Sequence, residues 1–174
     1  EPLSCVLNGH RRHGGVNPGE TVVIIGGGAI GLLHTALNLT CGAGQVILCE
    51  KHANRRDRAA AMGAVTTCPE HLSKVVAEHT GGHGAELVIV AIGRNELAEE
   101  SLNLAAPGGR VSWFAGFPKG STTTITPNTV HYQELTISGG SNASRADVHR
   151  AVDMLGRGNI DGTPIVTHTF GLSQ

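Results

Sequence analysis

One stretch of the chain constrains its fold more than any other, because residues Thr21 to Cys49 include no Asp, Glu, Lys or Arg. A membrane-spanning helix needs about 20 predominantly apolar residues, so this stretch is long enough to be considered as one. Glycines interrupt it, however, at 26–28, 31, 42 and 44, which are the places where turns would be needed. The pattern therefore favours a buried strand, a turn, a helix and a second buried strand over a membrane segment.

The glycines at the centre of this stretch form the pattern G-x-G-x-x-G, with Gly26, Gly28 and Gly31 at its fixed positions. In a dinucleotide site the first glycine permits a tight turn and the second lets the backbone approach a pyrophosphate. The third allows close packing of the helix on the strand. The helix N-terminus then offers free amides and a positive dipole end to the phosphates. The pattern predicts a dinucleotide site that needs no cationic side chain at the turn.

Glu50 follows the second predicted strand, about 20 residues after the glycines, where dinucleotide-binding domains place an acidic residue. Its carboxylate would accept hydrogen bonds from the adenosine ribose hydroxyls and would repel a 2′-phosphate, which favours NAD. Lys51, Arg55 and Arg56 are close by in the sequence and could accommodate a phosphate instead. We therefore expect NAD as the cofactor, with NADP as the less favoured alternative.

Predicted strands and helices alternate along the whole chain. The strands are expected at 21–25, 46–49, 65–67, 87–92, 111–114 and 135–138. Such alternation implies parallel strands joined by right-handed crossovers. The sequence therefore predicts an α/β fold with a doubly wound, parallel six-stranded sheet in the order 3-2-1-4-5-6.

The last predicted helix has two features of its own. Ser144 and Asp147 have the spacing of a capping box at its start. Its buried face is expected to consist of Val148, Ala151, Val152 and Leu155. The tail from Thr163 to Phe170 is predicted to be one more strand. Earlier in the chain, a helix with Glu96, Glu99 and Glu100 in its first turns is expected to end at Pro107-Gly108-Gly109.

Composition excludes several classes of function. With 13 basic and 14 acidic residues, the chain has no overall field that would hold a nucleic acid or an anionic membrane. Its four cysteines show no CxxC spacing, which favours free thiols and a reducing cytoplasm. Tyr132 is followed by Thr136 where short-chain dehydrogenases need Lys, and no G-x-S-x-G elbow supports a hydrolase.

Several stretches together resemble the medium-chain, zinc-dependent alcohol and polyol dehydrogenases, particularly the sorbitol and threonine dehydrogenase branch. They are EPLSCVLNG at 1–9, PGETVVIIGGGAIGLLH at 18–34, AAMGA at 60–64, GAELVIVAIG at 84–93, APGGRVSWFAGFPKG at 106–120 and HYQELTISGG at 131–140. They occur in the family's order along nearly the whole chain. The resemblance implies the nucleotide-binding, Rossmann-type domain of such an enzyme.

The resemblance also implies a division of the chain. A helix over 1–15 would link this domain to a catalytic domain, and residues 16–160 would form the dinucleotide-binding domain. Residues 161–174 would be a strand that returns toward the catalytic domain, which this sequence does not contain. The resemblance further suggests a homo-oligomer formed through the edge strand at 135–138.

Individual residues acquire roles from the same resemblance. The pyrophosphate site would consist of Gly26, Gly28 and Gly31 with the amides of Ala29 and Ile30. Glu50 would bind the ribose, with Lys51 and Arg55 beside the adenosine. Ala91, Ile92 and Gly93 would line the cofactor, and Ala115, Gly116 and Phe117 would lie near the nicotinamide. Glu1 would lie near the catalytic zinc, as a ligand or as a ligand of its water.

For a complete enzyme, the resemblance implies that zinc polarises an alcohol oxygen and that hydride passes to the nicotinamide. The other zinc ligands and most of the substrate pocket belong to the domain outside this sequence. We therefore expect this chain alone to bind NAD, to hold no zinc and not to turn over an alcohol or polyol. Two alternatives are a non-catalytic NAD-binding sensor or assembly module, and a methyltransferase. The methyltransferase loop is usually G-x-G-x-G, whereas position 30 is Ile.

Overall fold

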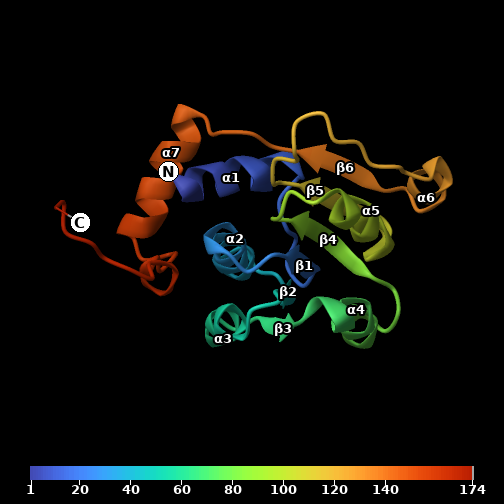
Figure 1. The fold of residues 1–174 in the computed structure, drawn as a ribbon, viewed down its shortest axis with the longest axis horizontal. Helices are drawn as coiled ribbons and strands as arrows, with labels where there is room; N and C mark the ends of the chain where they lie inside the picture. The colour runs from blue at the N-terminus through green and yellow to red at the C-terminus, as the bar shows by residue number, and fades with distance from the viewer. Residues whose placement is uncertain (174) are drawn as a thin grey trace.

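The computed structural model describes residues 1–173, whose strands form one parallel sheet of six strands (Figure 1). The strands are β1 (Thr21–Ile25), β2 (Gln45–Cys49), β3 (Val65–Thr67), β4 (Ala85–Val90), β5 (Ala105–Trp113) and β6 (Thr136–Gly139). They lie in the order β3-β2-β1-β4-β5-β6, and every neighbouring pair is parallel. The predicted fold class and strand order are therefore confirmed.

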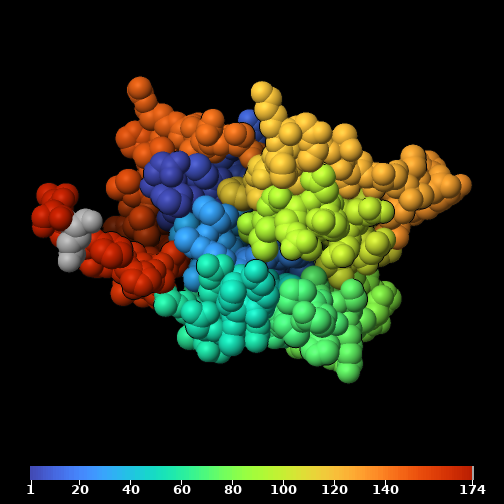
Figure 2. All heavy atoms as spheres, viewed as in Figure 1, coloured from blue at the N-terminus to red at the C-terminus, as the bar shows by residue number. Residues whose placement is uncertain are grey.

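Seven α-helices accompany the sheet in residues 1–173. They are α1 (Pro2–Arg12), α2 (Ala29–Thr40), α3 (Ala53–Ala61), α4 (Leu72–Thr80), α5 (Asn95–Asn103), α6 (Pro127–Tyr132) and α7 (Arg145–Gly156). No helix in this part of the chain is both long enough and apolar enough to cross a bilayer. Figure 2 shows that α6 and the C-terminal segment project at opposite ends of the molecule.

Apolar cores lie on both faces of the sheet, as alternation along a central strand requires. Val23 and Ile25 of β1 face the core that α4 and α5 cover, whereas Val22 and Ile24 face the core that α2 and α3 cover. All four side chains are at most 3% exposed. The charge-free stretch from Thr21 to Cys49 thus forms β1, α2 and β2, and burial on both faces of the sheet explains the apolar character of its two strands.

A third core lies beside the sheet, where α1 packs between α2 and α7 (Figure 1). Val6 and Leu7 of α1 meet Leu33 and Leu37 of α2 in this core, and Ala151 is the contribution of α7. A polar contact adds to it, because Arg11 lies 3.4 Å from Asp147 Oδ2. The helix expected at 1–15 therefore ends at Arg12 and is packed onto the nucleotide-binding fold along its length.

The capping box predicted at the start of α7 is confirmed, but the prediction of its buried face is wrong. The Ser144 and Asp147 capping box is present, with the Asp147 amide donating to Ser144 Oγ. Ala151 is buried, but Val148, Val152 and Leu155 are 43%, 64% and 46% exposed. Periodicity identifies an apolar stripe on a helix, but it does not determine which part of the stripe another element covers. Here α1 covers only the side that carries Ala151.

The tail also differs from its prediction. Residues 163–170 form no strand, and Thr163–Ile165 is instead a short 3-10 helix. A strand needs a neighbour to bond with, and the free edges of the sheet, β3 and β6, lie elsewhere.

The third difference concerns β5, which begins at Ala105 rather than Val111. The Pro107-Gly108-Gly109 segment therefore lies inside β5 and does not end a helix. The strand accommodates these residues at a register shift opposite Ala85 and Leu87 of β4. Gly108 has φ +74°, a backbone conformation that suits such an irregularity.

Candidate cofactor-binding site

The glycine-rich turn between β1 and α2 has the geometry that its spacing predicts. Gly26 has φ +113°, which favours glycine, and a Cβ atom added at Gly31 would lie 1.8 Å from the Gly26 carbonyl oxygen. A Cβ at Gly28 would meet nothing within 4 Å, so the space above this residue is open. No side chain caps the N-terminus of α2. The first amides of the helix, at Ala29 and Ile30, thus remain free to bind an anion.

Glu50 follows β2 and is bonded directly to this turn. Its Oε2 accepts a hydrogen bond from the Gly27 amide at 2.9 Å, and its Oε1 accepts one from the His52 amide at 2.9 Å. Arg55 Nη1 lies 3.6 Å from Oε2. Burial raises the pKa of the Glu50 carboxyl, but the two amide bonds and Arg55 outweigh it and leave the pKa below its usual value. Glu50 is therefore an anion held at a fixed position.

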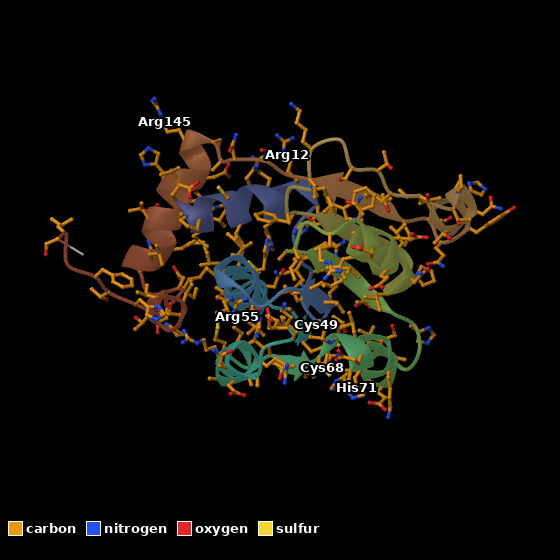
Figure 3. The ribbon with its side chains drawn as sticks, viewed as in Figure 1. Arg12, Cys49, Arg55, Cys68, His71 and Arg145 are labelled. Atoms are coloured by element: carbon orange, nitrogen blue, oxygen red, sulfur yellow. The ribbon has the colours of Figure 1, made fainter. Side chains whose placement is uncertain are left out.

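A cavity of about 510 Å³ opens beside Glu50. It is lined by Ile25, Cys49, Glu50, Lys51, Arg55, Pro69, Leu72, Ile92, Arg94, Glu96, Leu97 and Glu100. Its apolar walls suit a flat aromatic ring, and its rim carries charges of both signs. Figure 3 shows Arg55 and Cys49 on the side of the molecule formed by β2 and α3. Of the residues expected to bind the cofactor, Glu50, Lys51, Arg55 and Ile92 thus line one cavity.

The turns that follow β1, β4 and β5 meet at the carboxyl edge of the sheet. A Cβ at Gly26 would lie 2.6 Å from Ile92 Cγ1, and a Cβ at Gly93 would lie 1.9 Å from the Gly116 carbonyl oxygen. Ala91 is held by its amide, which donates to the Ile25 carbonyl. The turn after β1 therefore packs against the Ile92 side chain, and the turns after β4 and β5 pack backbone against backbone. They lie beside the topological switch point between β1 and β4, where the strand order of the sheet reverses. Doubly wound sheets bind their ligands at this point.

A second cavity, of about 280 Å³, lies over the glycine-rich turn. Its walls are Gly27, Gly28, Ala29, Leu32, Asn54, Arg55, Arg58, Ile165, Thr167 and His168. Two of the side chains are guanidinium groups and none is acidic, so the space suits a phosphate. Sequence reasoning missed Asn54, Arg58, Thr167 and His168. The tail residues are over a hundred positions from the motif, and no local pattern marks them.

A third cavity, of about 610 Å³, lies at the other end of the carboxyl edge. It is lined by Cys5, Arg12, Trp113, Phe114, Ala115, Gly116, Gly139, Gly140, Ser141 and Asn142. Ala115 and Gly116 are two of the three residues expected beside the nicotinamide. The third, Phe117, packs edge-on against Trp113 with ring centroids 6.2 Å apart.

Glu1, the one predicted metal-binding residue, is exposed at the start of α1. Its Oε1 accepts a hydrogen bond from Cys5 Sγ at 3.1 Å. A catalytic zinc takes three protein ligands, and within residues 1–173 no group of three His, Cys, Asp or Glu side chains could hold a metal ion. The residues of this chain alone do not fit a zinc site.

Comparison with known proteins agrees with this geometry. The family model described as zinc-binding dehydrogenase matches residues 29–157, from the start of α2 to the end of α7. The chain belongs to the zinc-binding dehydrogenase family. This result confirms the resemblance to medium-chain, zinc-type dehydrogenases that the sequence motifs indicate.

Curated relatives in this family include two L-threonine 3-dehydrogenases. The enzyme of Bacillus licheniformis is 32% identical over 178 residues, and that of Bacillus subtilis is 35% identical over 160 residues. These alignments cover 100% and 90% of this chain but 51% and 46% of the relatives. The chain thus spans about half the length of the curated relatives it matches.

Solved structures of the family share the fold. A candidate zinc-binding dehydrogenase from Sinorhizobium meliloti 1021, bound to NADP, superposes with a TM-score of 0.85 at 34% identity over 92% of this chain and 48% of that one. A protein described as a short-chain alcohol dehydrogenase, from Escherichia coli CFT073 and complexed with NADH, also shares the fold. It superposes with a TM-score of 0.88 at 25% identity over 98% of this chain and 50% of that one.

Proposed function

We propose that this chain is the NAD(H)-binding part of a zinc-type dehydrogenase that oxidises a polyol, a sugar alcohol or a secondary alcohol by hydride transfer. The observation that carries the proposal is the direct bond between the Gly27 amide and Glu50 Oε2. It places the carboxylate expected to bind ribose against the turn expected to bind pyrophosphate. The nicotinamide ring of the bound cofactor would accept the hydride.

The residues of the chain would bind and orient the cofactor. The amides at the start of α2 would bind the pyrophosphate, and Arg55 and Arg58 would add positive charge from the side of α3. The Glu50 carboxylate has two oxygens with about four acceptor positions, so it retains capacity for ribose hydroxyls beyond its two amide bonds. The turn at 115–117 would position the nicotinamide at the mouth of the 610 Å³ cavity.

The preference for NAD over NADP rests on charge. A 2′-phosphate on the ribose would approach the Glu50 carboxylate, whose low pKa keeps it ionised at neutral pH. Lys51 and Arg55 lie in the same cavity and reduce this repulsion. One structural relative is bound to NADP and another to NADH. We propose NAD as the preferred cofactor because the group nearest the expected ribose position is the anion.

We propose a zinc site only for a longer protein, in which residues outside this chain would supply the other metal ligands. Glu1 alone does not form a metal site. We expect this chain to bind NADH without oxidising an alcohol. The four free cysteines agree with an expected cytoplasmic location.

Calorimetric titration of the chain with NADH, NADPH and S-adenosylmethionine would test the proposal. We expect NADH to bind most tightly, NADPH more weakly and S-adenosylmethionine not at all. Preferential binding of S-adenosylmethionine would contradict the dehydrogenase assignment and favour a methyltransferase.

We also propose that the chain forms homodimers through β6, which lies at one edge of the sheet. Its exposed edge carries backbone groups that a second copy could bond, extending the sheet across two subunits. Light scattering at increasing concentration should show a dimer. Ile137→Pro should prevent dimerisation, and a parent chain that is monomeric at high concentration would contradict the proposal.

A further inference from the structure

Three histidines lie together where α1 packs onto α2, and none of them lines a cavity assigned to the cofactor. His10 and His13, at the C-terminal end of α1, have ring centroids 5.2 Å apart. His34 of α2 is fully buried, and its ring packs edge-on against Phe114 with centroids 4.5 Å apart. Both ring nitrogens of His13 and His34, and Nδ1 of His10, are buried without a hydrogen-bond partner in residues 1–173. Since buried polar atoms are normally bonded, this histidine cluster calls for an explanation.

The charged groups around the histidine cluster are cations or are already paired. Arg110 of β5 and Arg150 of α7 are close enough to act on its rings. Glu20 is bonded to Arg110, and Asp147 is bonded to Arg11 on the outer side of α1. No carboxylate in the described part of the chain forms an ion pair with any of the three rings. A proton added to the cluster would therefore meet positive charge without a free anion to balance it.

These surroundings keep the rings neutral while α1 is in place. Burial lowers the pKa of His13 to about 4; His10 and Arg110 add to this effect, and weaker backbone contacts at Gly15 oppose it. Burial lowers the pKa of His34 to about 3, and it lowers the pKa of His10 as well. Once α1 is released, hydrated rings would titrate near 6.5. At pH 5.0, each ring that becomes charged only on release would favour the released state about thirtyfold, and His13 and His34 together about a thousandfold.

The contacts of α1 are separate from the two cores of the sheet. Its side chains Leu3, Val6 and Leu7 belong to the third core, where α1 lies between α2 and α7 beside the sheet (Figure 1). Within residues 1–173, the cores on the two faces of the sheet contain no residue of α1 and no histidine. Release of α1 would therefore expose the third core and the histidine cluster while both cores of the sheet remain packed.

We propose that the histidine cluster is a pH-sensitive switch, which allows α1 to dock on the fold at neutral pH and releases it in mild acid while the sheet stays folded. The driving force is the cost of charging buried rings among cations, which the release of α1 removes by hydrating them. Such a local opening involves one packed element and is distinct from unfolding of the whole domain. Because α1 is also the expected link to a catalytic domain, the switch would make that link sensitive to pH.

Hydrogen exchange of the whole chain, followed by mass spectrometry and corrected for the intrinsic effect of pH on exchange, would test the release of α1. Peptides from α1 should be protected near neutral pH and should exchange like an unstructured segment at about pH 5. Peptides from β1 and β4 should remain protected at the same pH. Loss of protection in α1 and in the sheet together, or protection of α1 throughout, would overturn the inference.

Apolar substitutions in the histidine cluster should remove most of the acid response. In the double variant His13→Leu/His34→Leu, the protection of α1 at about pH 5 should exceed that of the parent chain about a hundredfold or more, since two of the rings that charge on release are absent. His149→Leu is the matched control, because His149 is exposed on α7, and it should behave like the parent. An acid response of the double variant equal to that of the parent would contradict the role of the cluster.

Proton NMR of the parent chain tests the same inference if the double variant does not fold. The ring signals of His13 and His34 should stay in the neutral form while α1 is docked. They should then titrate over the pH interval in which α1 loses its protection. Rings that become charged while α1 remains protected would show that charging them does not release the helix.

Phe114 connects the switch to the expected nicotinamide position. Its ring packs against His34, and a Cβ atom at Gly9 of α1 would lie 2.7 Å from it. Ala115 and Gly116 follow directly, so an effect of the switch on cofactor binding rests on the proposed function. NADH affinity of the parent should fall over the pH interval in which α1 is released, and it should fall less in His13→Leu/His34→Leu. A parent chain that releases α1 in acid but does not bind NADH at neutral pH would contradict the proposed function and leave the switch intact.

Discussion

The Gly27 amide donates a hydrogen bond of 2.9 Å to Glu50 Oε2, so the glycine-rich turn is joined to the acidic residue that follows the next strand. Glu50 is 5% exposed, and its side chain fills the space beside Gly27, where an added Cβ would come within 2.8 Å of Glu50 Cβ. The carboxylate thus has two functions in our interpretation. It holds the turn in shape, and it presents acceptors to a ribose.

Replacing Glu50 should change cofactor preference as well as affinity. Glu50→Ala is expected to weaken NADH binding by about tenfold or more and to improve NADPH binding relative to NADH, because the anion that repels a 2′-phosphate is removed. Dissociation constants for both cofactors would be measured by calorimetry. Glu50→Gln is the control, because it keeps the shape and an acceptor while removing the charge. Equal losses for both cofactors in Glu50→Ala would contradict the ribose-binding role.

Two glycines of the motif should respond to alanine in different ways. At Gly31 a Cβ would lie 1.8 Å from the Gly26 carbonyl oxygen, so Gly31→Ala should lower the melting temperature by several degrees or prevent folding. At Gly28 the added Cβ meets nothing within 4 Å, and φ is −72°, so Gly28→Ala should fold normally. It should nevertheless weaken NADH binding, because the methyl group would occupy the space proposed for the pyrophosphate. Thermal melts and NADH titrations of both variants would check this, and normal NADH affinity in Gly28→Ala would contradict the assigned phosphate position.

The parts of the fold predicted from sequence are those determined by local pattern. The β-branched run from Thr21 to Ile25, followed directly by glycines, favours a strand covered on both faces, and the glycines indicate where α2 begins. Alternation of elements then restricts the strand order to few possibilities. The outward face of α7 was not predictable in this way, because exposure of Val152 depends on what packs against the helix and not on its own sequence.

The candidate site also contains residues that a local sequence pattern identifies and residues that only tertiary packing brings there. Gly26, Gly31 and Glu50 were recognisable because their spacing is fixed by one βαβ unit. Arg58 and His168 were not, since they reach the cavity over the glycines from α3 and from the C-terminal segment. Arg12 was likewise hidden, because only the packing of α1 beside β6 gives it a place in a cavity.

Ser144 should contribute measurably to the stability of α7. Its hydroxyl and amide both donate to Asp147 Oδ2, at 2.6 and 2.9 Å, and its Oγ accepts from the Asp147 amide. Ser144→Ala removes the cap and should lower the free energy of unfolding by about 1 kcal/mol, whereas Ser144→Thr should retain most of it. Urea denaturation would measure the difference. A loss in Ser144→Thr equal to that in Ser144→Ala would show that the hydroxyl is not responsible.

Acid should destabilise the fold through two histidines at the packing of α1 on α2. His34 is fully buried, its ring nitrogens have no hydrogen-bond partner in the described residues, and its ring packs edge-on against Phe114. Burial lowers its pKa to about 3, and burial together with His10 and Arg110 lowers the pKa of His13 to about 4. In the unfolded chain both would titrate near 6.5. Below that pH the unfolded state binds more protons, so stability should fall as pH decreases from about 6.5 toward 4 and be nearly constant from 7 to 8.

The pH range from about 4.5 to 6.5 isolates this effect, because the carboxylates with lowered pKa, such as Glu50 and Asp147, lose their stabilising charge only at lower pH. Urea denaturation at several pH values would measure the slope. His34→Leu should reduce it, since the buried group that charges on unfolding is removed, whereas His149→Leu on the exposed side of α7 should leave it unchanged. If His34→Leu and the parent chain lose stability in parallel between pH 6.5 and 4.5, His34 is not the group responsible. The slope must then come from His10 and His13, whose pKa values burial also lowers, or from other groups.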